Sequence, residues 1–298
     1  MSIENPGMAV EPPVVHRRRG FRGRAWRALK KAPPTAWFGM IIIALYVFVA
    51  VFAPWLAPFG ESDTTGRAFE PWGSAHLLGT DQLGRDMLTR MIYGARNTIG
   101  IAFITTILAF VIGGVLGILV SIMRGPMDQF VSRAVDVLMA IPALIFALML
   151  LSIVGPSTIN IILIIAILDS TRVYRLTRSV AMNVVVMDYV ESARLRGEGL
   201  GWIMGREILP NILPPLVAEF GLRFCFVFLT ISSLSFLGLG IQPPTADWGS
   251  MVRENATLIS YGDITPLLPA GAIALLTVAV NFVVDWFLHK TSGLRDDG

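Results

Sequence analysis

The sequence predicts an all-α, polytopic membrane protein with six transmembrane helices. Hydrophobic residues make up 54% of the 298 residues and charged residues only 15%, which gives a mean hydropathy of +0.66. That apolar fraction exceeds what a soluble domain of similar size buries. The apolar residues also gather into stretches of about 20 residues, the length at which a helix crosses the hydrocarbon core.

Six stretches of the sequence reach this length. We expect spans at 36–56, 97–123, 130–154, 157–176, 209–237 and 264–288. The third and fourth come from one long apolar stretch, which we divide at Val154-Gly155-Pro156-Ser157 because Gly-Pro is a strong turn former. The expected organisation is a basic tail over 1–35, a membrane domain over 36–288 and a short tail over 289–298.

Lysine and arginine residues collect on one side of these spans. Eighteen lie on the side of the N-terminal tail and five on the other, while Arg223 lies inside the fifth span. Short loops rich in these residues stay cytoplasmic, so we expect both termini and the loop 182–208 to be cytoplasmic. The eight basic residues between Arg17 and Lys31 suit an anionic membrane surface. No nucleic-acid-binding motif accompanies them.

Several kinds of chemistry are excluded by what the sequence lacks. None of its three lysines lies in the Gly-Lys-Ser/Thr context of a nucleotide-binding loop. The three histidines are far apart in sequence and lie on opposite sides of the expected spans, which excludes a histidine metal site. Cys225 is the single cysteine and lies in an apolar stretch. We therefore expect no catalytic residue, metal or cofactor in this chain.

The loop 182–208 is charged and helix-forming, although apolar segments flank it on both sides. We expect a short surface helix within 182–199, with Asp188 and Glu191 exposed. Its expected apolar face is Val185, Val186 and Tyr189. Gly197 should turn the chain with a positive φ, and Pro210 should restart a membrane helix near its first turn. A connector lying on the lipid headgroups would show a similar apolar face.

A few charges lie inside the expected spans, where each costs at least about 2.5 to 3.5 kcal/mol. Glu219 and Arg223 are spaced i,i+4 and share one helix face. They could line a polar pathway, or neutralise each other or a charge on a partner. Asp169, near Arg172, is open to the same two interpretations, and Asp285 is the simpler case of an interface anchor. The glycines at 113, 114 and 117 predict close helix packing.

Motifs along most of the chain carry a family resemblance. Glu191, Ser192, Ala193, Gly197, Leu209 and Pro210 match the spacing of the EAA motif of ATP-binding-cassette importer permeases. The segments HLLGTDQLGRD at 76–86, LSFLGLGIQPP at 234–244 and DWG at 247–249 resemble the inner-membrane permeases of dipeptide, oligopeptide and nickel importers, and among them the second permease subunit. Ser192 stands where alanine is usual, and Ile231 where glutamate is common.

This resemblance implies a type I importer permease fold in a bacterial inner membrane. It implies a heterodimer with a homologous permease, two ATPase subunits that bind ATP and Mg, an extracytoplasmic substrate-binding protein and a peptide substrate. By the same resemblance, ATPase coupling falls to Asp188, Glu191, Ser192, Ala193, Gly197, Leu209 and Pro210. Docking of the binding protein falls to His76, Asp81, Arg85, Asp86, Gln242, Asp247 and Trp248. The charges Asp169, Glu219 and Arg223 are our candidates for the pathway.

Other functions remain open at this stage. The same machinery could import nickel chelates, opines, glutathione or oligosaccharides. An ion-coupled secondary transporter could use Asp169, Glu219 and Asp285 as ion sites, and it would need no cytoplasmic docking loop. An intramembrane aspartyl protease built on Asp169 and Asp285 would need flanking motifs that the sequence lacks.

Overall fold

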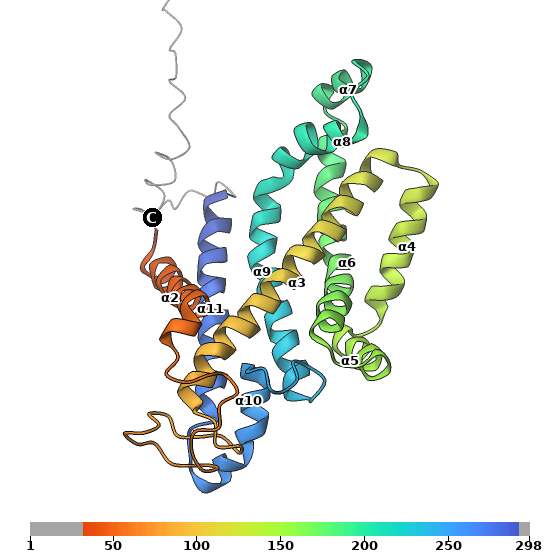
Figure 1. The fold of residues 1–298 in the computed structure, drawn as a ribbon. Helices are drawn as coiled ribbons and strands as arrows, with labels where there is room; N and C mark the ends of the chain where they lie inside the picture. Colours follow the sequence, from red (N-terminus) through yellow and green to blue (C-terminus); the bar gives the residue numbers. More distant parts are fainter. Residues whose placement is uncertain (1–31, 292–298) are drawn as a thin grey trace, which may run out of the picture.

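The computed structural model describes residues 32–291, which fold into helices joined by irregular loops. The 37-residue helix α3 (Met87–Met123) runs diagonally through the molecule, and α6 (Thr158–Val185) and α9 (Leu209–Phe236) cross it (Figure 1). Helices α2 (Pro34–Leu56) and α11 (Leu267–Thr291) pack together beside them. In the described part of the chain β pairing is limited to two isolated bridges in the loop 57–86. The basic cluster Arg17 to Lys31 lies outside the described residues.

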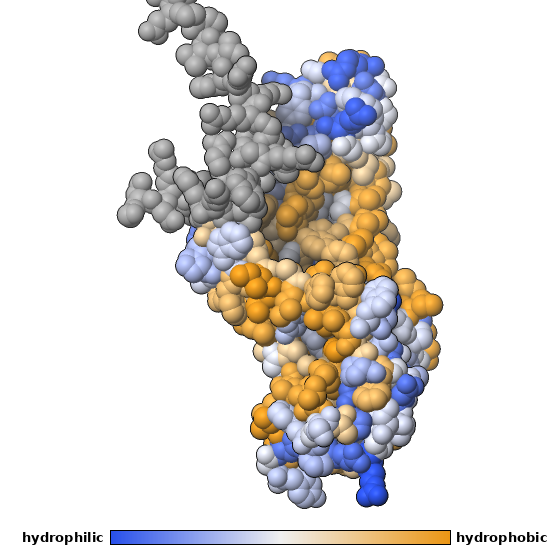
Figure 2. All heavy atoms as spheres, turned by 60° about the vertical axis from the view of Figure 1, so that its left-hand side comes forward, coloured by the Kyte–Doolittle hydropathy of each residue, from blue (hydrophilic) through white to orange (hydrophobic). Residues whose placement is uncertain are grey.

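The two ends of the molecule are polar and its middle is apolar. Helix α7 (Asp188–Leu195) protrudes at one end, and the loop 57–86 with α10 (Trp248–Asn255) forms the other (Figure 1). Figure 2 shows an apolar band between these hydrophilic ends. Within residues 32–291, four helical stretches are long and apolar enough to cross a membrane: 34–56, 87–123, 200–236 and 267–290. Helix α6 covers the fourth expected span, but Asp169, Arg172 and Arg175 make it too charged for this criterion. Six crossings therefore stay a prediction.

The second expected span begins ten residues too late. Helix α3 starts at Met87 because Asp86 caps it, accepting a hydrogen bond from the Thr89 backbone N–H at 2.8 Å. The first turns of α3 carry the polar side chains Thr89, Arg90 and Thr98, and all three are buried. A scale that measures only hydropathy assigns such a segment to a loop.

The third expected span is wrong as a single helix. Helices α4 (Pro126–Ala140) and α5 (Ala143–Val154) meet at an angle of 88°. Pro142 explains the break, because proline lacks a backbone N–H and disfavours helical geometry in the residue before it. Ile141 is accordingly extended, with φ −90° and ψ 131°. Our division at Gly155, where φ is +93°, is confirmed.

The loop 182–208 forms a hairpin between α6 and α9. Helix α6 continues to Val185, so the surface helix α7 is shorter than expected. Val190 and Ala193 form the buried face of α7, whereas Val186 is 61% and Tyr189 is 41% exposed. Our expected apolar face is therefore wrong for these two exposed residues, although Val185 is buried as expected.

The chain turns back directly after α7. Gly197 has φ +82°, as the sequence predicts. The short α8 (Leu200–Trp202) and a π-helical turn, η1 (Ile203–Ile208), then lead directly into α9. Pro210 lies in the first turn of α9, directly after the π-helical turn, where a residue without a backbone N–H costs little.

Two glycines allow α3 and α6 to approach closely. A Cβ atom at Gly113 would clash with the Ser170 carbonyl oxygen, and one at Gly117 would lie 2.8 Å from Cβ of Thr177. Gly114 faces away from α6 and has nothing within 4 Å of its Cβ position. The expected close packing is thus present at the first and third positions of the stripe.

We expect Gly113→Ala to destabilise the protein by about 1 to 3 kcal/mol, because the new methyl group forces two packed backbones apart. Gly114→Ala is the matched control: it adds the same methyl group to the same helix in open space, and should be neutral or stabilising by up to about 1 kcal/mol. The midpoint of thermal unfolding in detergent measures both. Equal midpoints for the two variants would contradict this packing.

Candidate functional site

The hairpin at α7 presents most of the motif residues to solvent. Asp188, Glu191, Ser192 and Gly197 are exposed, whereas the Ala193 side chain is completely buried. Val190 and Ala193 pack in an apolar cluster with Ile203 and Ile208 of the π-helical turn. Leu209 and Pro210 lie outside the hairpin tip, exposed on the first turn of α9. Helix α7 is thus seated on the start of α9 through its small and apolar residues.

Three charged side chains meet between α6 and α9, in the region of the predicted spans. Arg223 Nε lies 2.7 Å from Glu219 Oε1, and Arg223 Nη1 lies 3.6 Å from Asp169 Oδ1. The Arg223 guanidinium also lies 4.6 Å from the Phe226 ring centroid. The side chain of Arg223 is 8% exposed, that of Asp169 11% and that of Glu219 20%. We call these three residues the charge cluster.

The charge cluster differs from the sequence prediction in one respect. The i,i+4 pair of Glu219 and Arg223 forms as expected. Asp169, however, pairs with Arg223 across the helix interface, and no ion pair with Arg172 occurs within residues 32–291. Arg172 is exposed on α6 one turn further on. The cluster carries two carboxylates and one guanidinium, which leaves a net charge of −1 when all three are ionised.

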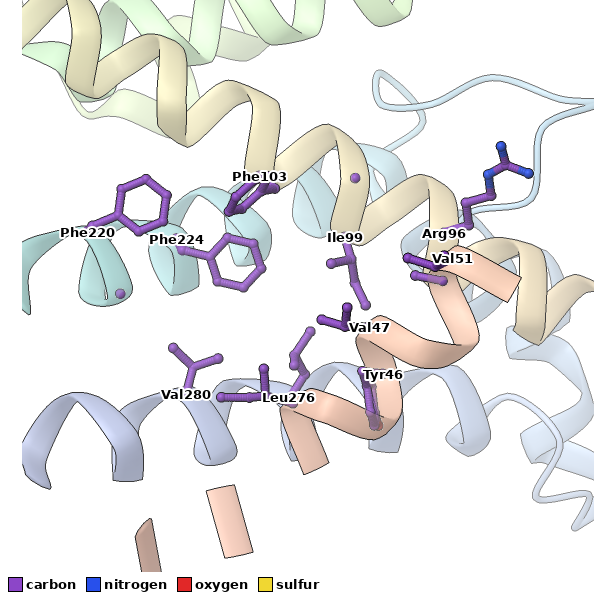
Figure 3. A pocket seen from close by; sticks show the side chains of 14 residues that line it. Tyr46, Val47, Val51, Arg96, Ile99, Phe103, Phe220, Phe224, Leu276 and Val280 are labelled. Atoms are coloured by element: carbon purple, nitrogen blue, oxygen red, sulfur yellow. The ribbon is translucent and has the colours of Figure 1, made fainter. Parts of the chain in front are cut away.

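A cavity of larger volume lies elsewhere in the described residues and is apolar. It measures about 700 Å³ and lies between α2, α3, α9 and α11, with Tyr46, Phe103, Phe224 and Val280 among its walls (Figure 3). Arg96 lies at one end with its guanidinium turned away from the other labelled side chains (Figure 3). A groove of this kind suits lipid chains or a neighbouring helix. It has few partners for the charged ends of a peptide.

The proposed docking residues at the α10 end are mostly buried. His76, Asp81, Arg85, Asp86, Asp247 and Trp248 are each 6% exposed or less, and Gln242 is half-buried. Asp81 Oδ2 lies 2.7 Å from Arg85 Nε and 3.3 Å from Arg90 Nε. Glu254 of α10 completes the group, with Oε2 3.4 Å from Arg85 Nη2 and 3.6 Å from Arg90 Nη2. This buried quartet joins the loop 57–86 and the first turn of α3 to α10.

Asp247 and Trp248 hold the start of α10 in place. Asp247 caps α10 by accepting a hydrogen bond from the Ser250 backbone N–H, and it also accepts one from the Thr98 hydroxyl, both at 2.9 Å. Complete burial raises the pKa of Asp247, against the opposing effect of these hydrogen bonds. Trp248 Nε1 donates to the Met91 carbonyl oxygen at 3.0 Å, and its ring meets Tyr46 edge-on. His76 Nδ1 lies 3.0 Å from Asp86 Oδ1.

Sequence reasoning missed several partners in this outer network. Arg90, Thr98 and Glu254 were not singled out, although Arg90 is 1% exposed. The contact between Arg85 and Glu254 joins residues 169 positions apart, so no local spacing announces it. The one available signal was arginine close to the start of an apolar helix, where a charge that cannot reach water needs a partner.

Two family models match most of the described chain and leave 72–108 between them. The family of the "Binding-protein-dependent transport system inner membrane component" matches residues 109–290. The "N-terminal TM domain of oligopeptide transport permease C" matches residues 20–71. A solved structure, "an amino acid ABC transporter with histidines", superposes with a TM-score of 0.51 at 19% identity, over 68% of this chain and 94% of that chain. At this identity the likeness shows the fold alone.

Curated relatives match at higher identity. The di/tripeptide transport system permease protein DppC of Pseudomonas aeruginosa is 36% identical over 87% of this chain and 85% of its own. The dipeptide permease DppC of Escherichia coli is 35% identical, over 87% and 86% respectively. The probable D,D-dipeptide permease DdpC of Escherichia coli is 31% identical over 99% and 96%.

The matched family consists of multi-pass inner-membrane transport components without enzymatic activity of their own. Its match covers more than half of the sequence, in the region that holds the charge cluster, the α7 hairpin and α10. This chain therefore belongs to the family of binding-protein-dependent transport system inner membrane components.

Proposed function

We propose that this chain is one of two permease subunits in an ATP-driven importer of dipeptides and oligopeptides. It forms half of the pathway, and a homologous permease forms the other half. Two ATPase subunits bind ATP and Mg, and an extracytoplasmic binding protein delivers the peptide. The relatives described above as di/tripeptide and dipeptide transport system permeases support the substrate class.

The α7 hairpin is the observation that carries the ATP-driven mechanism. Its charged residues are exposed while Val190 and Ala193 fix it to the base of α9. A force on α7 therefore acts on α6 and α9 together, and the charge cluster ties these two helices to each other further along. A connector lying on headgroups would instead bury its apolar residues in lipid, but the buried residues of α7 face protein.

Reconstitution tests this function against its alternatives. The whole assembly, in proteoliposomes with ATP inside and loaded binding protein outside, should accumulate labelled dialanine. Replacing the binding protein by one that carries a nickel chelate, opine, glutathione or oligosaccharide tests the other cargoes. If the purified chain alone moved dialanine down an ion gradient without ATP, an ion-coupled secondary transporter would replace this proposal.

We expect Glu191→Ala to weaken retention of the ATPase by about tenfold or more, the effect of losing an interface anchor of ~2 kcal/mol. Copurification of the ATPase with tagged permease and ATP-dependent uptake of dialanine measure this. Glu198→Ala is the control: Glu198 lies in the same hairpin, and its ion pair with Arg196, at 3.9 Å, is half exposed and weak. Similar ATPase retention in both variants would rule out coupling through Glu191.

Gly197→Ala tests the shape of the hairpin separately. A Cβ atom there meets nothing within 4 Å, so the methyl group clashes with no neighbour. The cost is conformational, about 1 to 2 kcal/mol, because φ is +82°. We expect uptake to fall while ATPase retention changes less than in Glu191→Ala. Wild-type uptake would show that the turn has no role in transmitting force.

We propose that the outer loops receive the binding protein through exposed residues that the buried docking residues position. Asp81 Oδ1 accepts a hydrogen bond from the Leu83 backbone N–H at 2.8 Å, which orders a turn whose side chain at Leu83 is 56% exposed. Leu77, in the same motif, is 64% exposed. The exposed side chains of Leu77 and Leu83 can therefore contact the binding protein, whereas the buried side chains of Asp81 and Arg85 cannot.

This division of roles predicts two different phenotypes. Leu83→Ala should leave the thermal midpoint unchanged and weaken stimulation of ATP hydrolysis by the binding protein. Asp81→Asn should lower the stability of the permease by about 3 to 5 kcal/mol, because it leaves two buried guanidinium groups with one carboxylate. Thermal unfolding and titration of hydrolysis with binding protein distinguish them. Unchanged titration in Leu83→Ala would remove the turn from the docking surface.

A further inference from the structure

A small polar cavity lies beside the charge cluster, between α5, α6 and α9. Its volume is about 180 Å³, and Asp169, Arg172 and Thr230 supply its polar groups. Ala143 and Ala147 of α5 and Phe226 of α9 are among its apolar walls. The break at Pro142 brings α5 across this region, since α5 leaves α4 at 88°. The cavity thus owes one wall to the bend that interrupts the third apolar segment.

Asp169 has unused capacity to accept a cation. Its Oδ1 atom faces Arg223, which also pairs with Glu219 at the shorter distance of 2.7 Å. Its Oδ2 atom is buried and has no hydrogen-bond partner within the described chain. The guanidinium of Arg223 is thus shared by two carboxylates, and the one further positive group on this cavity's lining is Arg172. A buried carboxylate oxygen without a donor is costly and favours an arriving ammonium group.

Arg172 supplies a complementary positive group on the same cavity. It follows Asp169 by three residues, a rise of about 4.5 Å along α6. The side chain is exposed and forms no ion pair within residues 32–291. The ends of an extended dipeptide are about 7 Å apart, a span that the flexible arginine side chain can match. Asp169 and Arg172 therefore offer one negative and one positive group, which can pair with the ammonium and the carboxylate of a zwitterion.

The size of the cavity limits what it holds. Sites for whole drug-sized ligands measure about 300 Å³ or more, so 180 Å³ accommodates one end of a peptide. Ala143 and Ala147 leave room for a first side chain, and Phe226 offers an apolar face. A transport site must also release its substrate, so a small site with partly compensated charge is suitable.

We propose that this cavity is a transient subsite that holds the α-ammonium group of a translocating peptide against Asp169, with the peptide carboxylate directed toward Arg172. This rests on the proposed function as a peptide importer. The subsite recognises the α-ammonium end common to all peptides, a dipeptide is short enough for its carboxylate to reach Arg172 as well, and side-chain selection is left to other groups.

The test uses the complete assembly in proteoliposomes with labelled dialanine. Asp169→Asn keeps the shape of the side chain and the pairing of Glu219 with Arg223, so we expect the fold and the ATP hydrolysis stimulated by loaded binding protein to persist. Uptake per ATP hydrolysed should fall about tenfold, the effect of losing one charge-assisted hydrogen bond. Asp169→Glu should restore most of the uptake, and Arg172→Gln should lower it. Asp285→Asn, on α11 and away from the cavity, is the control and should match wild type.

A binding measurement separates a ligand contact from a structural role. Dialanine retained by the vanadate-arrested assembly should be lost in Asp169→Asn and kept in Asp169→Glu. Wild-type uptake and retention in Asp169→Asn would overturn the subsite and leave the importer intact. Loss of stimulated hydrolysis in both Asp169 variants would assign Asp169 a structural role and also overturn the subsite. Absence of ATP-driven dialanine uptake in the wild-type assembly would instead overturn the proposed function.

Discussion

The arrangement of α6 and α9 depends on the ion pairs of Arg223. A guanidinium this far inside an apolar helix cannot stay unpaired, and it finds its carboxylates on both α9 and α6. Glu219 pairs with Arg223 on the same helix at 2.7 Å, and the longer contact to Asp169 at 3.6 Å links α9 to α6. The hairpin that joins the same two helices carries α7. The ion pairs of this buried cation therefore link α6 and α9 at one point, and the hairpin with the exposed helix α7 links them at another.

Buried ion pairs also hold the opposite end of the molecule, where four charged side chains meet. Asp81, Arg85, Arg90 and Glu254 form a buried quartet in which each carboxylate faces two guanidinium groups. Removing water from four charges is expensive, and mutual pairing offsets that cost only when the geometry is complete. The quartet therefore ties the loop 57–86 to α10, while Leu77 and Leu83 of that loop stay exposed. The molecule thus has a closed network of ion pairs at its α10 end and the charge cluster in its middle.

Much of this could be predicted from the sequence, but mainly where the signal is local. Apolar length placed the main helices, and Gly155 and Gly197 marked turns because only glycine adopts their φ readily. Pro142 carried an equally local signal that hydropathy concealed, since apolar residues surround it. The burial of Asp81 and the contact of Asp169 with Arg223 depend on which helices become neighbours, and periodicity within a single segment contains no information about that. Resemblance to a family directed attention to the loops at both ends of the molecule, but it did not indicate that motif residues such as Asp81 and Arg85 are buried.

Exposed apolar side chains in and next to α7 also favour a protein partner. Leu195 is 83% exposed and Met187, the residue before α7, is 47% exposed, on a segment that protrudes at one end of the molecule (Figure 1). Exposed apolar groups of this size on a hydrophilic protrusion favour burial against another surface. A cleft that buries Leu195 while pairing with Glu191 would satisfy both. The same surface is fixed from behind by Val190 and Ala193, so a partner that grips it moves the helices instead of deforming the loop.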